Sequence, residues 1–263
     1  MDLGIKGKRA LVTGASRGIG KAVVVDLAKE GVKLAVVSRS KERLNKVFEE
    51  IGGKKAGHYM VLAELTEEGA PENLAKDIKK NFGDVDILVN NVGDTMGITD
   101  PYCSIKDWRK IFRLNMEVAV ELNNFFIPQM KKNKWGRIVN VTAGASMENS
   151  GPVPYCTCKA AITAYTRSMA RILALEGGDV VMSAVLPGVI LTEEGHWETV
   201  LRERPEHAEK YLKERCPLGR FGKPSEISPM VLLLCSKLAT FYHGSIVLVD
   251  AGQAKHFHNV GGL

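Results

Sequence analysis

The sequence predicts an α/β fold in which helices cover both faces of a parallel sheet. Three observations indicate this class. Short apolar runs alternate with helical patterns along the whole chain, the first run leads through a glycine-rich turn into a helix, and a later run closes on polar residues and a glycine. The 263 residues suit a single domain, 1–263, because no composition shift or linker divides them.

The first half of the chain alternates regularly between the two kinds of element. Strands are expected at short runs of valine, leucine and isoleucine, and helices where apolar residues recur every three or four positions. The predicted order is strand 9–13, helix 21–30, strand 34–37, helix 41–51, strand 58–62, helix 71–81 and a strand within 86–93.

The second half continues the alternation, with one long helical pattern and one charged insertion. Asn115 lies inside the long pattern. Asparagine is a mediocre helix former, and from the residues alone a solvent-facing side chain is slightly favoured over a buried one. The predicted order is helix 108–130, strand 137–142, loop 143–152, helix 155–175, strand 180–186, insertion 193–215, helix 225–237 and strand 245–249.

The turn after the first strand reads Thr-Gly-Ala-Ser-Arg-Gly-Ile-Gly over residues 13–20. It stands between a strand and a helix, which is the context in which a glycine cluster indicates nucleotide binding and not just a turn. Gly14, Gly18 and Gly20 would let the backbone approach a pyrophosphate, and the helix N-terminus would present free N–H groups to it. The turn therefore predicts a nucleotide site.

The end of strand 34–37 indicates which nucleotide is bound. An acidic residue there would accept hydrogen bonds from the ribose 2′-hydroxyl of NAD, whereas an arginine can hold the 2′-phosphate of NADP. This chain has Ser38 followed by Arg39, with Arg17 nearby in the glycine turn. NADP(H) is therefore the predicted cofactor, and two exposed surface arginines are the alternative.

Tyr155 and Lys159 stand at the start of helix 155–175, four residues apart, so both side chains lie on one helix face. An ammonium held close to a phenol favours the phenolate and lowers the pKa of the tyrosine toward the range of a proton-transfer catalyst. Tyr155 is thus expected to exchange a proton with a carbonyl or alcohol oxygen. An ordinary surface pair is the alternative for these two residues taken alone.

Composition and charge argue against several other classes. The net charge of +6 is spread along the chain, so no basic stripe for nucleic acid is indicated. No apolar run reaches the ~18 residues of a spanning helix, and no membrane association is expected. Five cysteines without CxxC spacing favour packing thiols in a reducing compartment, and the expected location is the cytoplasm. No metal site is expected, since His256 and His258 lie in a polar tail.

Together these motifs resemble the short-chain dehydrogenase/reductase family, and the match runs in order along nearly the whole chain. The matching segments are TGxxxGxG at 13–20, NNxG at 90–93, Asn115 in its helix, Tyr155 with Lys159, and Pro187 and Gly188 with Ile190 and Thr192. The resemblance implies a Rossmann fold with a doubly wound, seven-stranded parallel sheet and helices on both faces. It also implies NAD(P) binding, a small carbonyl or alcohol substrate, and a homotetramer or homodimer.

The resemblance implies roles for individual residues. Tyr155 would be the general acid/base, Lys159 would lower its pKa and hold the nicotinamide ribose, and Asn115 would anchor a water of the proton relay. The family's substrate-binding serine falls on Thr142 when counted back from Tyr155, but on Ala143 when counted along the strand. Thr142 is our choice and Ser146 the fallback.

The cofactor-binding set implied by the resemblance spans both halves of the chain. Glu64, Leu65 and Asn90 would contact the adenosine side, whereas Ile190 and Thr192 would hold the nicotinamide carboxamide. The full set is Gly14, Ser16, Arg17, Gly18, Ile19, Gly20, Arg39, Glu64, Leu65, Asn90, Gly93, Tyr155, Lys159, Pro187, Gly188, Ile190 and Thr192.

Relatives carry a substrate lid where this chain has the insertion 193–215. Its aromatic and basic content suits a bulky or anionic substrate, such as a 3-oxoacyl thioester or a sugar derivative, although a solvated amphipathic helix accounts for the same residues. The predicted reaction is hydride transfer between NADP(H) and a ketone or secondary alcohol. The alternatives are a redox-sensing or scaffolding protein that binds the dinucleotide with little turnover, and a dehydratase or epimerase acting on a nucleotide sugar.

Overall fold

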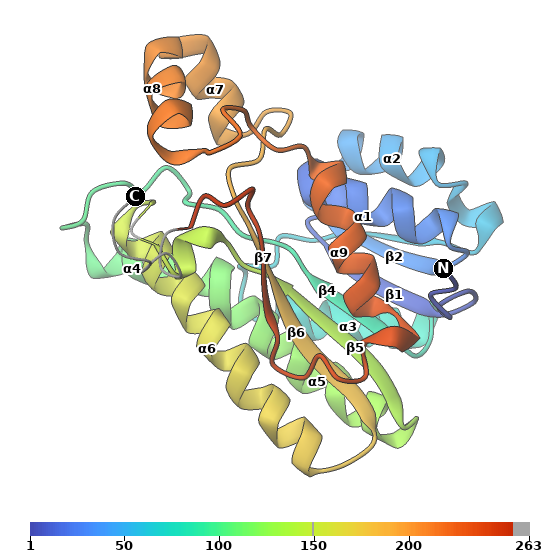
Figure 1. The fold of residues 1–263 in the computed structure, drawn as a ribbon. Coiled ribbons are helices and arrows are strands. Elements are labelled where there is room, and N and C mark those ends of the chain that lie inside the picture. Colours follow the sequence, from blue (N-terminus) through green and yellow to red (C-terminus); the bar gives the residue numbers. More distant parts are fainter. Residues whose placement is uncertain (149, 255–263) are drawn as a thin grey trace.

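The computed structural model describes residues 1–148 and 150–254, and it contains a sheet of seven parallel strands (Figure 1). From one edge to the other the strand order is β3-β2-β1-β4-β5-β6-β7. The strands are β1 Arg9–Thr13, β2 Lys33–Ser38, β3 Tyr59–Leu62, β4 Ile87–Asn90, β5 Trp135–Val141, β6 Asp179–Pro187 and β7 Ile246–Val249. The predicted seven-stranded Rossmann fold is confirmed.

Helices cover both faces of the sheet. They are α1 Gly18–Lys29, α2 Lys41–Glu50, α3 Ala70–Asn81, α4 Ile105–Phe112, α5 Val118–Lys132, α6 Val153–Leu175, α7 His196–Glu203, α8 Pro205–Arg215 and α9 Pro224–Cys235. Successive residues of a strand point to opposite sides. In β1, Ala10 and Val12 pack in the core that α1, α2 and α9 cover, whereas Leu11 packs in the core under α3, α5 and α6.

Strands of this sheet are buried on both faces, which explains why they form continuous apolar runs in the sequence. The predicted elements occur with their ends shifted by a few residues, and two segments differ in kind. The pattern 108–130 is not one helix, and the insertion 193–215 forms two short helices, α7 and α8, that stand apart from the sheet (Figure 1). A helix ends before Pro205, because proline disfavours the helical conformation of the residue before it.

The interruption of the long helical pattern centres on Asn115. Residues Arg113–Glu117 form a π-helical turn between α4 and α5. The Asn115 amide donates to the carbonyl of Ile111 at 3.0 Å and to the carbonyl of Asp94 at 2.9 Å, and its oxygen accepts from the Asp94 N–H at 3.2 Å. Its side chain is buried, with the residue 2% exposed, so the interpretation of a solvent-facing asparagine is wrong.

Strands β1 and β4 are neighbours in the middle of the sheet. From β1 the strand order continues outward to β2 and β3, and from β4 it continues in the opposite direction to β5, β6 and β7. This is the switch point at which open α/β sheets form a crevice beyond the carboxyl ends of their strands. The two strand ends are tied together, because the Thr13 hydroxyl accepts from the N–H groups of Asn91 (3.0 Å) and Val92 (3.1 Å). Within the described residues, no helix has both the length and the apolar character of a membrane span.

Candidate active site

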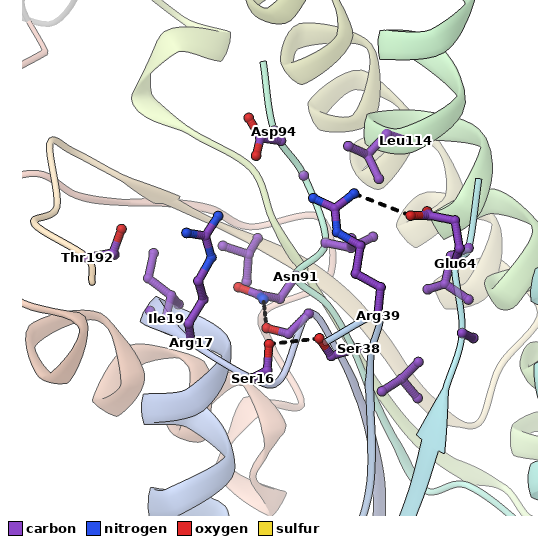
Figure 2. A pocket seen from close by; sticks show the side chains of 18 of the residues that line it. Ser16, Arg17, Ile19, Ser38, Arg39, Glu64, Asn91, Asp94, Leu114 and Thr192 are labelled. Atoms are coloured by element: carbon purple, nitrogen blue, oxygen red, sulfur yellow. Dashed lines mark hydrogen bonds and ion pairs between the residues drawn. The ribbon is translucent and has the colours of Figure 1, made fainter. Parts of the chain in front are cut away.

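A cleft of about 280 Å³ lies at this switch point, over the carboxyl ends of β1, β2 and β4 (Figure 2). Backbone turns, arginines and hydroxyl groups line one end, and the Tyr155–Lys159 pair lines the other. The lining residues are Gly14, Ser16, Arg17, Gly18, Ile19, Val37, Ser38, Arg39, Arg43, Ala63, Glu64, Leu65, Asn91, Val92, Gly93, Asp94, Leu114, Val141, Thr142, Tyr155, Lys159 and Thr192.

The glycine turn forms the floor of the cleft between β1 and the start of α1. Gly14 and Gly18 have φ of 65° and 55°, in the left-handed region that side chains rarely adopt. A Cβ on Gly14 would also come within 2.9 Å of the Asn91 amide nitrogen. The turn therefore leaves its backbone bare at the N-terminus of a helix, the arrangement that binds phosphate.

The polar end of the cleft is built from the ends of β1 and β2. The hydroxyls of Ser16 and Ser38 are hydrogen-bonded at 2.7 Å, and Arg17 and Arg39 stand on either side of this pair (Figure 2). Arg39 forms an ion pair with Glu64 at 3.3 Å. Arginine and hydroxyl groups in this number suit a phosphomonoester, so these residues fit the phosphorylated dinucleotide NADP.

The opposite end holds the proton-transfer residues. The Lys159 ammonium donates to the Val141 carbonyl at 3.3 Å and lies 5.6 Å from the centre of the Tyr155 ring. A Cβ on Gly93 would stand 2.6 Å from the Lys159 nitrogen and 2.8 Å from the Asn115 side-chain oxygen. Glycine at this position therefore allows Lys159 and Asn115 to approach the same strand end.

The pKa of Tyr155 differs from the sequence-based expectation. Burial, followed by the negative charge of Asp94, raises the pKa of this phenol above its ordinary value. Burial also lowers the pKa of Lys159 to about 8, because the desolvated ammonium is disfavoured. The expected lowering of the Tyr155 pKa is not found in the protein alone, because burial and the charge of Asp94 act in the opposite direction.

Thr142 and Ser146, the two candidates for the serine role, are placed differently. Thr142 lines the cleft beside Tyr155, and its hydroxyl makes only a long 3.4 Å contact to the Val185 carbonyl. Ser146 lies in the short helix Gly144–Ser146, outside the cleft lining. Its hydroxyl oxygen is buried and has no hydrogen-bond partner among the described residues. The placement favours Thr142.

The structure keeps two of the expected cofactor residues out of the cleft. Asn90 turns its amide to the side-chain oxygens of Asn123 and Asn140, each at 2.9 Å, because successive strand residues face opposite sides. Gly20 instead allows α1 to pack against the turn, since a Cβ there would lie 2.2 Å from the Gly14 carbonyl oxygen. Neither Asn90 nor Gly20 lines the cleft in this structure, and their contact with the cofactor stays a prediction.

The segment after β6 also departs from expectation. Of Pro187, Gly188, Ile190 and Thr192, only Thr192 lines the cleft. Residues 189–191 pair with Gly222, so that Ile190 packs on Gly222 and lines a separate cavity of about 140 Å³ together with Gly188. Pro187 ends β6 and is buried. Pro187, Gly188 and Ile190 therefore do not line the cleft.

Three of the polar lining residues were not anticipated from the sequence. Asn91, the second asparagine of the NNxG motif, lines the cleft in place of Asn90, and the apolar run before the motif, buried throughout, does not show which of the two faces it. Arg43 follows Arg39 by four residues and lies in the first turn of α2, so both arginines can reach the same side of the helix start. Asp94 carried no signal beyond its position next to Gly93. Within residues 1–148 and 150–254 no cluster of three metal-ligating side chains occurs, and His256 and His258 lie outside the described residues.

Comparison with known proteins agrees with this geometry. The family model described as short chain dehydrogenase matches residues 8–199. The 3-oxoacyl-(acyl-carrier-protein) reductase FabG of Aquifex aeolicus is 36% identical over 256 residues, covering 96% of this chain and 100% of the relative. That of Thermotoga maritima is 31% identical over 250 residues, covering 94% and 98%.

Solved structures of reductases are also similar to this chain. L-sorbose reductase from Gluconobacter frateurii, in complex with NADPH and L-sorbose, superimposes with a TM-score of 0.86 at 28% identity, covering 97% of this chain and 99% of its own. A 3-oxoacyl (acyl-carrier-protein) reductase from Agrobacterium tumefaciens with NADP bound gives 0.85 at 27% identity, covering 95% and 96%. The protein belongs to the short-chain dehydrogenase family, as its glycine turn and Tyr155–Lys159 pair predicted.

Proposed function

We propose that the protein is an NADP(H)-dependent oxidoreductase that interconverts a ketone and a secondary alcohol. One observation carries this proposal: Tyr155, Lys159 and Thr142 line the same cleft as the glycine turn and the arginines at its polar end. The NADP(H) complexes of the sorbose and 3-oxoacyl reductases support the cofactor. When bound, the nicotinamide supplies or accepts the hydride.

The residues of the chain handle the proton and the orientation of the substrate. Burial keeps the Tyr155 phenol protonated, so in the direction of reduction it gives its proton to the carbonyl oxygen. Lys159, with a pKa of about 8, exchanges protons near neutral pH and can return one to Tyr155. Thr142 donates a hydrogen bond to the same carbonyl oxygen. Asn115 holds the loop at Asp94, and its place in the family motif assigns to it the anchoring of a relay water.

The proposed substrate is a small carbonyl or alcohol compound. The relatives include reductases named for 3-oxoacyl thioesters and for a sugar, so both classes belong in the first substrate panel. Trp197 of the lid packs against Tyr211 and Phe221, with ring centres 4.4 and 5.1 Å away. This cluster supports a lid at 193–215 that closes over the substrate and excludes water.

We further propose a single domain working as a homotetramer or homodimer in the cytoplasm. The seven strands form one sheet, which supports one domain. Helices α4 and α6 leave Ile105, Val153, Ile172 and Leu175 exposed, and β7 is an edge strand. Exposed apolar side chains and an open strand edge are typical of surfaces that a second copy covers.

The direct test is the turnover of a ketone panel with NADPH by the wild type and by Tyr155→Phe. Loss of the proton donor should lower kcat by about 10²–10⁴-fold, while NADPH binding measured by calorimetry changes little. Tyr165→Phe, ten residues further along α6, is the matched control and should keep its activity. Equal rates for the wild type and Tyr155→Phe would reject the proposed mechanism, and NADPH binding without turnover of any substrate would favour the redox-sensing alternative.

A further inference from the structure

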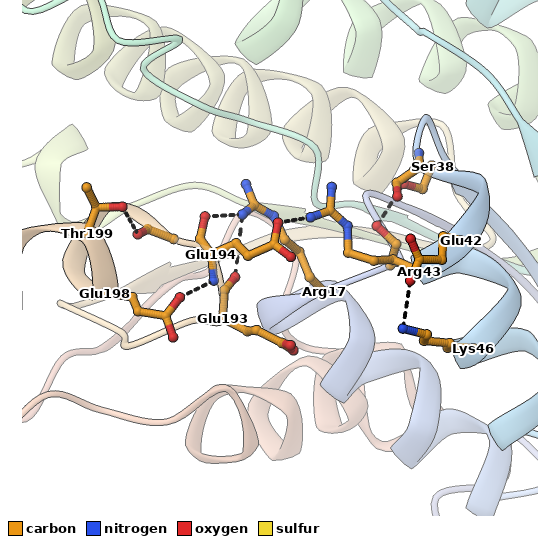
Figure 3. Close-up of polar contacts among 12 residues, drawn as sticks. Arg17, Ser38, Glu42, Arg43, Lys46, Glu193, Glu194, Glu198 and Thr199 are labelled. Carbon is orange, nitrogen blue, oxygen red and sulfur yellow. Dashed lines mark hydrogen bonds and ion pairs between the residues drawn. The ribbon is translucent and has the colours of Figure 1, made fainter. Parts of the chain in front are cut away.

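The arginines at the polar end of the cleft are engaged by the loop that leads into the lid. The Glu194 carboxylate forms an ion pair with the Arg43 guanidinium (Figure 3). Arg17 donates to the backbone carbonyls of Glu193, at 3.4 Å, and of Glu194. One short loop therefore holds two of the three arginines that line the cleft.

Arg43 lies between two environments. On one side it lines the main cleft, and on the other it lines a neighbouring cavity of about 370 Å³ that also includes Ser16, Glu193 and Glu194. Its Nε is buried and has no hydrogen-bond partner among the described residues. The guanidinium thus has a donor left for a second acceptor while its terminal nitrogen is held by Glu194.

The loop that supplies the carboxylate has an unusual backbone. Glu194 has φ of 52°, in the left-handed region that residues other than glycine seldom adopt. Helix α7 begins at His196, only two residues later. The contacts with Arg17 and Arg43 therefore hold both a disfavoured conformation and the start of the lid.

We propose that Glu194 is a specificity-determining residue for the cofactor, because its carboxylate competes with the 2′-phosphate of NADP for Arg43. The proposal rests on the NADP dependence argued above. A 2′-phosphate bound near Ser16 and Ser38 would attract the positively charged Arg43 guanidinium. The phosphate and the Glu194 carboxylate would then compete for the same hydrogen-bond donors of Arg43. NAD has no 2′-phosphate, so its binding leaves the Arg43–Glu194 pair in place.

Release of Glu194 would also act on the lid. When the 2′-phosphate forms an ion pair with Arg43, the loop 193–195 loses the Arg43–Glu194 ion pair. The first turn of α7 then becomes more mobile. NADP, but not NAD, would thereby change the position or the mobility of the lid. Cofactor choice and lid movement are in this way coupled through one side chain.

The test measures dissociation constants of NADP⁺ and NAD⁺ by calorimetry for the wild type, Glu194→Gln and Arg43→Ala. An exposed ion pair is worth little, so Glu194→Gln should tighten NADP⁺ binding by about two- to fivefold and leave NAD⁺ within twofold. Arg43→Ala should weaken NADP⁺ by roughly tenfold or more, and adding Glu194→Gln to it should change nothing further. Glu193→Gln removes the same charge one residue away and keeps the pair, so it should behave as the wild type.

Weaker or unchanged NADP⁺ binding by Glu194→Gln would overturn the proposal, as would an equal gain in Glu193→Gln. Hydrogen exchange of residues 196–203 gives a readout independent of affinity: it should rise with NADP⁺ and not with NAD⁺ in the wild type. Arg39→Ala separates the two levels of the argument. If it leaves the NADP⁺ to NAD⁺ ratio unchanged and that ratio is near one, the NADP dependence itself fails; if only Glu194→Gln is silent, the competition alone fails.

Discussion

Thr142, the first residue after β5, is the proposed hydrogen-bond donor to the substrate carbonyl. Thr142 lines the cleft and makes only a long contact within the protein, so Thr142→Val should preserve the shape and remove the donor. Losing one such donor lowers kcat by about 10²–10³-fold, with little change in the binding of NADPH. Ser146→Ala is the matched control and should stay within threefold of the wild type. Steady-state kinetics decides, and a large loss in Ser146→Ala instead would transfer the role to that residue.

At the scale of single residues, the sequence predicted which side chains share the cleft better than it predicted their individual contacts. Spacing placed Tyr155 and Lys159 on one helix face, the other family motifs predicted that this face meets the cofactor, and both residues line the cleft. Spacing did not decide the placement of Asn90, because neither asparagine of the motif could be assigned a side of the strand without knowing the register. It also failed for the pKa of Tyr155, since burial is a property of the packed molecule and does not appear in a spacing of four.

At the scale of elements, the π-helical turn joins two parts of the fold. Asn115 links this turn to the loop at Asp94 through two hydrogen bonds, and a third joins its buried side chain to the Ile111 carbonyl. Asn115→Ala would leave these backbone groups without a partner, so the free energy of unfolding should fall by about 1–3 kcal/mol. Asn124→Ala, on an exposed position of α5, should change it by less than about 0.5 kcal/mol. Urea unfolding measures both, and equal effects would show that the Asn115 contacts stabilise little.

Most elements could be predicted because their cause is local. The strands are buried runs, and the helices repeat their apolar residues every three or four positions, so patterns of ten residues or fewer identify both. The π-helical turn has no such pattern. It exists because Asn115 finds partners at Asp94, 21 residues earlier in the chain, and such a long-range contact leaves no periodic trace. The split between α7 and α8 was not predicted, although Pro205, the first residue of α8, is a local signal for it.

Across the whole molecule, buried ionisable groups give opposite contributions to the pH dependence of stability. Burial raises the pKa of Cys235 to about 12. The stability that the buried neutral thiol contributes is therefore fully present below the ordinary thiol pKa, and it is lost as the pH rises toward 12. Lys159 has the opposite sign. Its pKa is lowered to about 8 in the fold, so the unfolded chain binds more protons between pH 8 and 10.5, and stability rises with pH in that window.

Replacing Lys159 with methionine isolates this contribution from those of the thiols and tyrosines. Lys159 is 3% exposed, and keeping its ammonium buried below pH 8 costs on the order of 3 kcal/mol. Without cofactor, the unfolding free energy of Lys159→Met relative to the wild type should therefore fall by about that amount between pH 7.5 and 10.5. Lys210→Met changes a lysine whose side chain is 72% exposed, so it should show no comparable slope. A difference between Lys159→Met and the wild type that stays constant across this window would mean that the amine is hydrated in the cleft, and Lys159 could not then serve as the near-neutral member of the proton relay.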